Sequence, residues 1–324
     1  MTGPVVAVIA AFEPDGELPE VVERALAQCD SVIVVDDGSP SRSAGAERGV
    51  REVLDACAIA GATVIEQPQN QGIACALNTG IREARRLGGR YVLTLDQDTH
   101  IESGYVTKAL NHLTLAGSVG VEAAMVSPSL INDDVAPFWF ADKGLTLAFE
   151  PIQSGLLIPC TVFDTIGLFE EDLFIDCVET EFYLRARAHG MSALVVPGTR
   201  IRHRLGRTAS WEPPWPLRPI LLRGRGSGAT IEFTEHPPTR NYYISRNRLV
   251  LYRRYARAEP LWCAVSVAKD TLIRGRAMLI GTQRPARIRL SVAGVRAALA
   301  GDTGKIPDGL VRRRGHPRSV GGSV

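Results

Sequence analysis

Short apolar runs alternate with amphipathic, helix-length segments over the first 130 residues of the chain. Short apolar runs bounded by turn residues are typical of buried strands, and apolar positions repeating every three to four residues are typical of helices. This alternation predicts an α/β fold with a mostly parallel central sheet flanked by helices. The predicted strands are Val5–Ala11, Ser31–Val35, Thr63–Glu66, Tyr91–Leu95 and Val119–Val126, and the predicted helices cover residues 17–28, 44–60 and 73–87.

The pattern becomes irregular after residue 130. A helix is predicted at Val178–His189 and a strand at Ala193–Val196, whereas residues 205–239 are rich in Gly, Pro and Trp and predict an extended loop. Three basic helices are predicted near residues 240–257, 260–282 and 286–300.

Length and pattern together predict a domain organisation. A protein of 324 residues can bury a large core and still carry an appendage. We expect an α/β domain over residues 1–257, in two halves at about 1–130 and about 131–257. A helical appendage at 258–303 and a disordered tail at 304–324 follow.

The net charge of +2 hides an asymmetry. Residues 1–199 carry 12 Lys and Arg against 28 Asp and Glu, a net charge of −16, and residues 200–324 carry 25 against 7, a net charge of +18. The basic part is suited to anionic phosphates on a donor, on a lipid-linked acceptor or at a membrane surface. Basic charge alone is weak evidence for nucleic acid, and none is expected as a partner.

Cysteine spacing and hydropathy suggest where the protein works. The six cysteines show no C-x-x-C spacing, no secretory signal precedes them, and no run of 18 apolar residues occurs. We therefore expect reduced thiols, no membrane-spanning helix and a cytoplasmic protein, with peripheral association at the inner face of the cell membrane left open. The sequence does not indicate an oligomeric state.

Two aspartates follow the strand at residues 91–95. The side chains of Asp96 and Asp98 would project into the crevice beyond the carboxyl ends of the strands, where α/β sheets bind ligands. Paired carboxylates there suit Mg²⁺ or Mn²⁺ with phosphate oxygens as further ligands. Taken alone, such a pair more often just ends a strand and caps a helix, here one starting near Ser103, and it is the other motifs that favour a metal site.

A second acidic pair, Asp36-Asp37, follows the strand at residues 31–35 and precedes Gly38-Ser39. A carboxylate at this point is placed to accept the ring N–H of a pyrimidine base, and Gly38 would allow a sharp backbone turn. Taken alone, the four residues are an ordinary turn.

Together these motifs resemble the family 2 glycosyltransferases, nucleotide-sugar enzymes with the GT-A fold. More narrowly, the sequence is similar to bacterial rhamnosyltransferases that use dTDP-L-rhamnose. The resemblance runs in the family's order over roughly residues 5–257. Its motifs are Val35–Ser39, Asn70–Ala74 with Ala76–Asn78, Leu93–Asp98, Ser154-Gly155, Leu168-Phe169 through Glu181, His203–Gly206, Arg240–Tyr243 and Arg246-Asn247.

The resemblance implies roles for individual residues. Asp96 and Asp98 would hold the metal ion, and His203 would complete its site, although a surface histidine beside arginines is the simpler alternative. The nucleotide sugar would be bound by Ala10–Phe12, Asp36 or Asp37, Asn70, Gly72, Asn78 and Asp96. Arg240 and Arg246 would contact phosphates of donor or acceptor, although helix-face solvation accounts for them equally well.

The resemblance also implies a catalytic base among three carboxylates at residues 176–181. Aligned on Leu184-Arg185, the base is Glu179, where relatives carry Asp, and Asp176 is the reserve. Glu181 is expected to pair with Arg185 one helical turn later. The implied reaction is one inverting displacement that converts dTDP-L-rhamnose into an α-L-rhamnoside on a glycan or polyprenyl-linked acceptor in cell-wall or surface polysaccharide synthesis.

Three alternatives remain open from the sequence. A close alternative is a UDP-sugar donor carrying GlcNAc, galactose or galactofuranose. Uracil and thymine present the same N–H to an aspartate, so Asp36-Asp37 does not separate the two kinds of donor. A non-catalytic nucleotide-sugar-binding subunit would account for the Asp-to-Glu change at residue 179. A nucleotidyltransferase is disfavoured because no Gly-rich phosphate loop follows the first strand.

The C-terminal helices carry an apolar face marked by Leu261, Trp262, Val265, Leu272 and Ile273. A core-facing helix and an interfacial helix that brings the enzyme to a lipid-linked acceptor both account for it.

Overall fold

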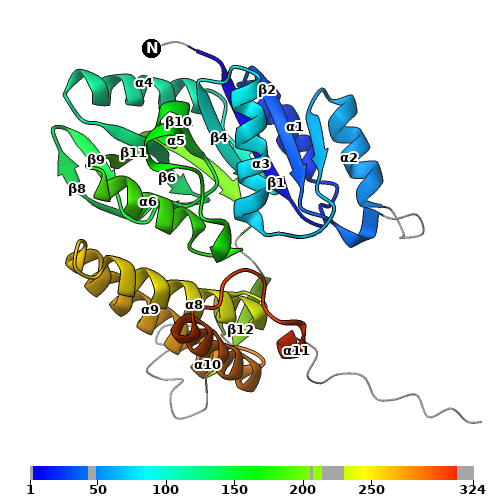
Figure 1. Ribbon diagram of the computed structural model, residues 1–324, viewed down its shortest axis with the longest axis vertical. Coiled ribbons are helices and arrows are strands. Elements are labelled where there is room, and N and C mark those ends of the chain that lie inside the picture. The colour runs from blue at the N-terminus through cyan, green and yellow to red at the C-terminus, as the bar shows by residue number, and fades with distance from the viewer. Residues whose placement is uncertain (1–2, 43–48, 205–206, 214–229, 312–324) are drawn as a thin grey trace, which may run out of the picture.

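The computed structural model describes residues 3–42, 49–204, 207–213 and 230–311. It consists of an α/β part with a helical layer packed beneath it (Figure 1). The first half of the α/β part follows the predicted alternation closely. Strands β1 (Val5–Ala11), β2 (Ser31–Asp36), β3 (Thr63–Glu66) and β4 (Tyr91–Asp96) lie in the order β3-β2-β1-β4, all parallel, and helices α1 (Leu18–Leu26), α2 (Val50–Ile59) and α3 (Ile73–Arg86) connect them.

The second half of the sheet is mixed. Strands β6 (Ala123–Ile131) and β11 (Ser192–His203) are parallel to each other, but β10 (Leu156–Pro159) lies antiparallel between β4 and β6. The parallel prediction therefore applies to the first four strands and to the β6–β11 pair, while the later strands add antiparallel neighbours. These are β5 (Thr99–Ile101), β7 (Asp134–Val135), β8 (Phe138–Asp142) and β9 (Leu145–Ala148).

Alternation along the strands creates two apolar layers. In β1, Val6 and Val8 face α3, α5 (Cys160–Ile166) and α6 (Val178–Ala188), whereas Val5 and Ala7 face α1, α2 and α4 (Tyr105–Ser118). Burial of both faces explains the continuous apolar runs in the sequence. Residues 119–121, predicted to begin a strand, instead close the C-terminal end of α4, where the Val121 N–H bonds to the Ala116 carbonyl.

The helical layer contains α8 (Pro238–Tyr255), α9 (Pro260–Ile280), α10 (Arg284–Ala300) and α11 (Asp308–Val311). Gly294 of α10 lies so close to the Tyr242 carbonyl of α8 that a Cβ would be 2.2 Å from the oxygen. Because α8 packs on α10, the proposed boundary at residue 257 falls inside this layer. Within the described residues, no helix combines the length and hydropathy needed to cross a membrane.

Two other C-terminal predictions differ from the structure. Within the predicted loop 205–239, β12 (Arg207–Trp211) and β13 (Ile231–Glu235) form an antiparallel pair. In the predicted disordered tail, residues 304–311 are described and include buried Ile306 and helix α11, because this segment folds back onto α8. Residues 312–324 lie outside the described residues.

The buried Glu150 carboxylate connects the helical layer to the sheet. It pairs with Arg248 of α8 and Lys269 of α9, and it accepts hydrogen bonds from Trp262 Nε1 at 2.9 Å and Ser266 Oγ at 2.6 Å. Despite the burial that opposes ionisation, these partners lower the pKa of Glu150 to about 2. The α/β part and the helical layer are thus joined by a fully compensated buried charge.

Candidate active site

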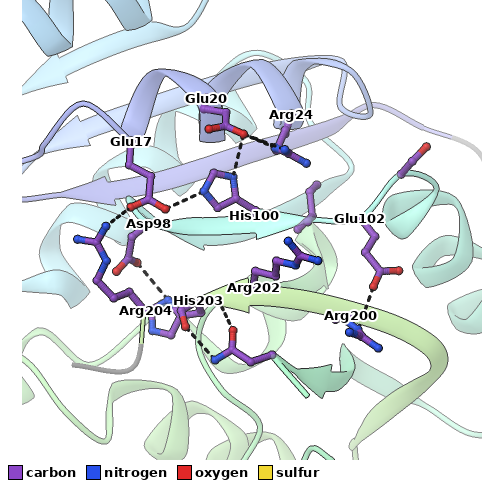
Figure 2. Close-up of a pocket in the computed structure, with 13 residues that line it drawn as sticks. Glu17, Glu20, Arg24, Asp98, His100, Glu102, Arg200, Arg202, His203 and Arg204 are labelled. Atoms are coloured by element: carbon purple, nitrogen blue, oxygen red, sulfur yellow. Dashed lines mark hydrogen bonds and ion pairs between the residues drawn. The ribbon is translucent and has the colours of Figure 1, made fainter. Parts of the chain in front are cut away.

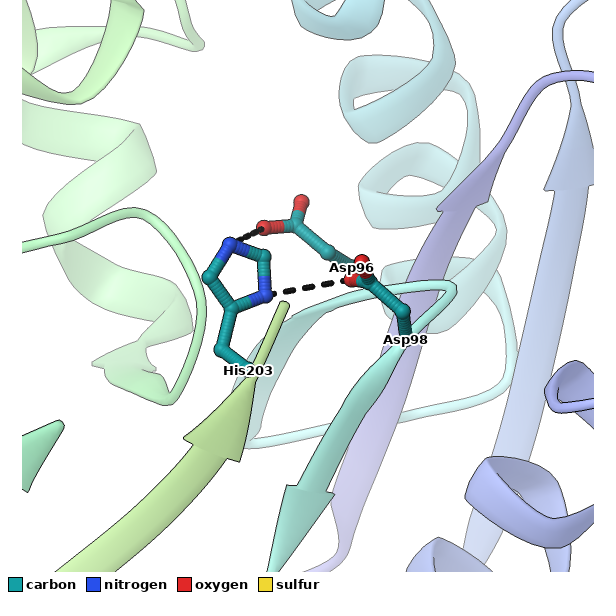
Figure 3. Close-up of side chains that lie close together, drawn as sticks. All are labelled: Asp96, Asp98 and His203. Atoms are coloured by element: carbon teal, nitrogen blue, oxygen red, sulfur yellow. Dashed lines mark ion pairs between the residues drawn. The ribbon is translucent and has the colours of Figure 1, made fainter. Parts of the chain in front are cut away.

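Asp96, Asp98 and His203 lie together at one edge of the sheet (Figure 3). Asp96 ends β4, Asp98 lies on the turn before β5, and His203 ends β11, which pairs with β5 so that His203 faces Thr99. His203 Nδ1 is 3.1 Å from Asp98 Oδ1, and His203 Nε2 is 3.8 Å from Asp96 Oδ2. One ligand atom from each of the three lies within 4.8 Å of the others.

Ser154 and Thr99 support this group from behind. The Ser154 hydroxyl, fully buried, accepts the Asp96 N–H at 2.9 Å and donates to Thr99 Oγ1 at 2.7 Å. Thr99 Oγ1 lies 2.9 Å from His203 Nδ1. The Ser154-Gly155 motif therefore acts on the geometry of the group and not on a ligand.

The electrostatics of the group fit a divalent cation. Burial, with the charge of Asp98, raises the pKa of Asp96 to about 6, against the opposing charges of His203 and Arg240. Burial disfavours the His203 imidazolium, but its hydrogen bond to Asp98 and the two carboxylate charges outweigh that effect and raise its pKa. Two carboxylates and one imidazole, mutually close and half-buried, are a donor set suited to Mg²⁺ or Mn²⁺.

A cavity of about 220 Å³ adjoins Asp96. Its walls come from the ends of β1 and β4, the start of α3 and the segment before α6. Six of the predicted nucleotide-sugar residues line it, namely Ala10, Phe12, Asp37, Asn70, Gly72 and Asp96. Apolar walls with a few polar groups are typical of small-ligand sites.

The Asp36-Asp37 pair has a structural role. Asp36, fully buried, accepts hydrogen bonds from the N–H and the hydroxyl of Ser39, and it does not line the cavity. The Asp37 carboxylate accepts the N–H groups of Gln71 and Gly72, each at 2.8 Å. Burial raises the pKa of Asp37, although these two hydrogen bonds oppose the rise. Asp37 thus connects the strand-end turn to the loop that begins α3, and its contact with a base stays a prediction.

Asn78, Arg240 and Arg246, like Asp36, do not line the cavity. The Asn78 amide donates to the Phe169 carbonyl at 2.9 Å and accepts the Phe169 N–H at 3.0 Å. Arg246, 1% exposed, donates to backbone carbonyls of Leu173 and Gly304. These side chains use their polar atoms within the fold, since their partners lie in segments that come close only after folding.

The three carboxylates at residues 176–181 have different surroundings. Asp176 pairs with Arg240 of α8, and Glu181 pairs with Arg185 at 2.7 Å, as predicted. Among the described residues no cation forms an ion pair with Glu179, whose carboxylate accepts the Thr180 hydroxyl at 3.3 Å. Burial, then the charge of Asp176, raises the pKa of Glu179 to about 7, against a hydrogen bond to its own N–H and the charge of Arg248.

Sequence reasoning missed a larger cavity of about 710 Å³ on the other side of Asp98 and His203 (Figure 2). Figure 2 shows α1, β5 and β11 around it, with charged side chains from all three. Arg200, Arg202 and Arg204 recur at every second position along β11 and just beyond its end, an alternation that could have indicated one charged strand face. Many of these charges neutralise each other, as in the Arg204–Glu17 ion pair at 2.6 Å.

The α/β fold with an acidic group beside a cavity is the arrangement expected of the GT-A glycosyltransferases that the sequence resembles. Residues 6–148 match the model of glycosyl transferase family 2, which supports a glycosyltransferase. It is 26% identical over 232 residues to "dTDP-rhamnosyl transferase RfbF" of Shigella flexneri, covering 67% of this protein and 70% of that one.

The solved structures that match are more distant in sequence. Residues 1–349 of S. aureus TarS in complex with UDP-GlcNAc superpose with a TM-score of 0.48 at 12% identity, covering 92% of each protein. GalNAc-T7 with UDP, GalNAc and Mn²⁺ superposes with a TM-score of 0.47 at 14% identity, covering 62% of this protein and 44% of that one.

Proposed function

We propose that this glycosyltransferase transfers L-rhamnose from dTDP-L-rhamnose, with inversion, to a glycan or polyprenyl-linked acceptor in surface polysaccharide synthesis. The observation that carries the proposal is the Asp96, Asp98 and His203 group beside a cavity lined by predicted donor-binding residues. The similarity to a protein named a dTDP-rhamnosyl transferase supports the choice of donor.

In this proposal Glu179 is the base that removes the proton of the acceptor hydroxyl. Its pKa of about 7 matches the neutral range in which a base must be both ionised and able to hold a proton. Asp176 is less suited, because its carboxylate is already occupied by Arg240, which pairs with it and donates from Nε at 3.1 Å. Direct displacement without a covalent intermediate would invert the sugar configuration.

Asp96, Asp98 and His203 would hold Mg²⁺ or Mn²⁺ at the diphosphate end of the donor. When bound, such an ion supplies Lewis-acid stabilisation of the charge that develops on the leaving phosphate. Thr99 holds the His203 ring, and Ser154 holds the backbone of Asp96 and the Thr99 hydroxyl, through the hydrogen bonds described above.

A thermal-shift panel tests the donor and the metal together. The purified protein is heated with Mn²⁺ and dTDP-, UDP- or GDP-sugars, because a ligand that binds only the native state raises the apparent melting temperature. We expect selective stabilisation by dTDP-rhamnose that is lost in Asp98→Ala and retained in Asp133→Ala, an exposed carboxylate paired with Arg200. Stabilisation by a UDP-sugar instead would contradict dTDP-rhamnose as the donor, but it would still be consistent with a glycosyltransferase.

We also propose that the C-terminal helices dock on an anionic membrane surface. Trp262 of α9 is fully buried, but Leu261 and Leu272 are 63% and 74% exposed. Exposed apolar side chains recur along one side of both helices: Leu261, Val265, Leu272 and Leu279 on α9, and Ile288, Val292, Val295 and Leu299 on α10.

Charge favours a lipid surface over a second copy of the protein. Residues 260–300 contain seven Lys and Arg against one Asp. Lys269 and Arg287 are paired with Glu150 and Glu235, and the remaining basic side chains would favour an anionic surface and repel a second copy of the same face. Sedimentation with phosphatidylglycerol vesicles should deplete the protein, and Leu272→Glu should abolish the effect. Ile59→Glu, at an exposed apolar position on α2, is the control. Equal sedimentation of both variants, or none of the wild type, would contradict membrane docking.

A further inference from the structure

The segment before α6 contains three non-glycine residues in the left-handed backbone region. Phe174, Asp176 and Cys177 have φ angles of 64°, 65° and 64°. Residues other than glycine rarely adopt this backbone region, and such conformations persist only where surrounding contacts impose them. The segment is at the centre of the site, since Phe174 and Ile175 line the donor cavity and Glu179 follows in the first turn of α6.

Two neighbouring side chains of α8 hold the carbonyls of this segment. The Asn247 amide nitrogen lies 3.0 Å, 2.9 Å and 2.8 Å from the carbonyl oxygens of Leu173, Ile175 and Asp176. The Arg246 guanidinium donates to Leu173 at 2.9 Å, and its Nε donates to Asn247 Oδ1 at 2.9 Å. Because both side chains are buried, neither can be replaced by water without an opening of the fold.

The segment after α10 closes the arrangement. The Gly304 N–H donates to the Asp172 carbonyl at 2.7 Å, and Arg246 donates to the Gly304 carbonyl at 2.6 Å. The Ile306 N–H donates to the Tyr243 hydroxyl at 2.8 Å, and the Tyr243 ring stacks on Phe174 with 5.3 Å between the centroids. Residues 302–306, which we name the strap, thus contact the strained segment directly and through Tyr243.

The strap also carries a basic side chain. Lys305 is exposed between the two anchoring residues Gly304 and Ile306, and its charge opposes the rise that burial causes in the pKa of Asp37. Asp37 lines the cavity.

We propose that Arg246, Asn247 and the strap act as a clasp that holds residues 172–177, two of which line the donor cavity, in the conformation that positions Glu179 in the first turn of α6. They are positioning residues for the transfer reaction, and the inference rests on the proposed function for its catalytic part. The clasp replaces the phosphate contact predicted for Arg246, since its donors already bind backbone carbonyls.

The sharpest test is Asn247→Asp. The substitution keeps the size of the side chain and an oxygen that can accept the hydrogen bond from Arg246 Nε. It replaces the amide N–H donor with a carboxylate oxygen, which repels the carbonyl oxygens of Leu173, Ile175 and Asp176. Tyr243→Phe is a milder variant that removes only the hydroxyl anchoring the strap. Arg253→Ala, on the same helix and away from the segment, is the control.

Two readouts are compared in the full-length protein. Hydrogen exchange of the amides of residues 173–177 should accelerate about tenfold or more in Asn247→Asp, less in Tyr243→Phe and not in Arg253→Ala. With dTDP-rhamnose, kcat should fall about a hundredfold in Asn247→Asp while KM stays within about threefold, because a displaced base affects the chemical step more than donor binding.

Unchanged exchange at residues 173–177 in Asn247→Asp would overturn the clasp, as would a loss of kcat shared equally by Arg253→Ala. If wild-type protein turns over no nucleotide sugar, the proposed function fails, but the exchange readout still decides whether the clasp exists. If Asn247→Asp does not fold, the graded response of Tyr243→Phe against Arg253→Ala decides the same question.

Discussion

The acidic residues at the end of β4 and those at the start of α6 are similar in sequence and opposite in surroundings. Asp96 and Asp98 share His203 as a potential cation and lie at the edge of the sheet. Glu179 has no ion-pair partner among the described residues, while its neighbours Asp176 and Glu181 are each paired with arginine.

This difference assigns roles that spacing alone cannot. Carboxylates that converge on one point with an imidazole are arranged for a cation. A single carboxylate left without a cation in a buried place has a raised pKa and is arranged for proton transfer. Neighbouring paired carboxylates help to create this condition, since the charge of Asp176 is among the causes of the shift.

The largest expected effect is at the metal-binding group. Asp98→Ala should reduce transfer about a thousandfold, because several kcal/mol of charge stabilisation depend on the ion that these ligands would hold. Donor turnover measured across a Mn²⁺ titration checks this, with Asp133→Ala as the exposed control. If high Mn²⁺ leaves both variants equally active, Asp98 is not a ligand.

Glu179→Gln tests the other side of the comparison. We expect kcat to fall about a hundredfold to a thousandfold, because the amide cannot accept the acceptor proton. Donor binding in the thermal-shift panel should be unchanged, and the folded state should not be weakened, since a buried charge without a partner is removed. Turnover equal to that of the wild type would exclude Glu179 as the base and favour a different carboxylate.

The pH dependence of kcat should follow the ionisation of Glu179. The base form of Glu179 grows as pH rises through about 7, so the wild-type rate should increase up to that pH and then level off. Because its folded pKa lies above the usual 4.5, its protonation stabilises the fold below that value, and this contribution is lost as pH rises through about 7. Chemical denaturation should therefore show that the free energy of unfolding falls more between pH 5 and pH 8.5 in the wild type than in Glu179→Gln.

The two acidic regions also differ in how far the sequence predicts them. Asp96 and Asp98 follow a strand that is defined by its own apolar run, so a local signal located this pair, and the family resemblance supplied His203. The surroundings of Glu179 depend on α8, whose Arg240 lies 64 positions away from Asp176. No periodicity in the sequence reports such a contact.

The same limit explains the residues whose positions the sequence missed. Asn78 and Arg246 belong to motifs of the family, but their hydrogen bonds run to Phe169, Leu173 and Gly304, across 58 to 91 residues. The antiparallel insertion of β10 is likewise set by tertiary pairing, since its apolar run is compatible with either strand direction. Patterns thus predicted the strands and helices and the position of Asp96 and Asp98, and tertiary contacts decided which polar side chains support the fold.

The smallest expected effect on activity is at Glu181, where the comparison predicts a purely structural role. Its side chain is 2% exposed and receives Arg185 and the Tyr255 hydroxyl, the latter at 3.0 Å. Glu181→Gln should change kcat by less than about twofold, and it should lower the free energy of unfolding by about 1–3 kcal/mol because Arg185 loses its charged partner. Glu170→Gln, which removes the more exposed partner of Arg254, is the control and should cost less stability. A loss of kcat in Glu181→Gln with unchanged stability would mean that the segment has two functional acids, and the contrast between paired and unpaired carboxylates would no longer identify the base.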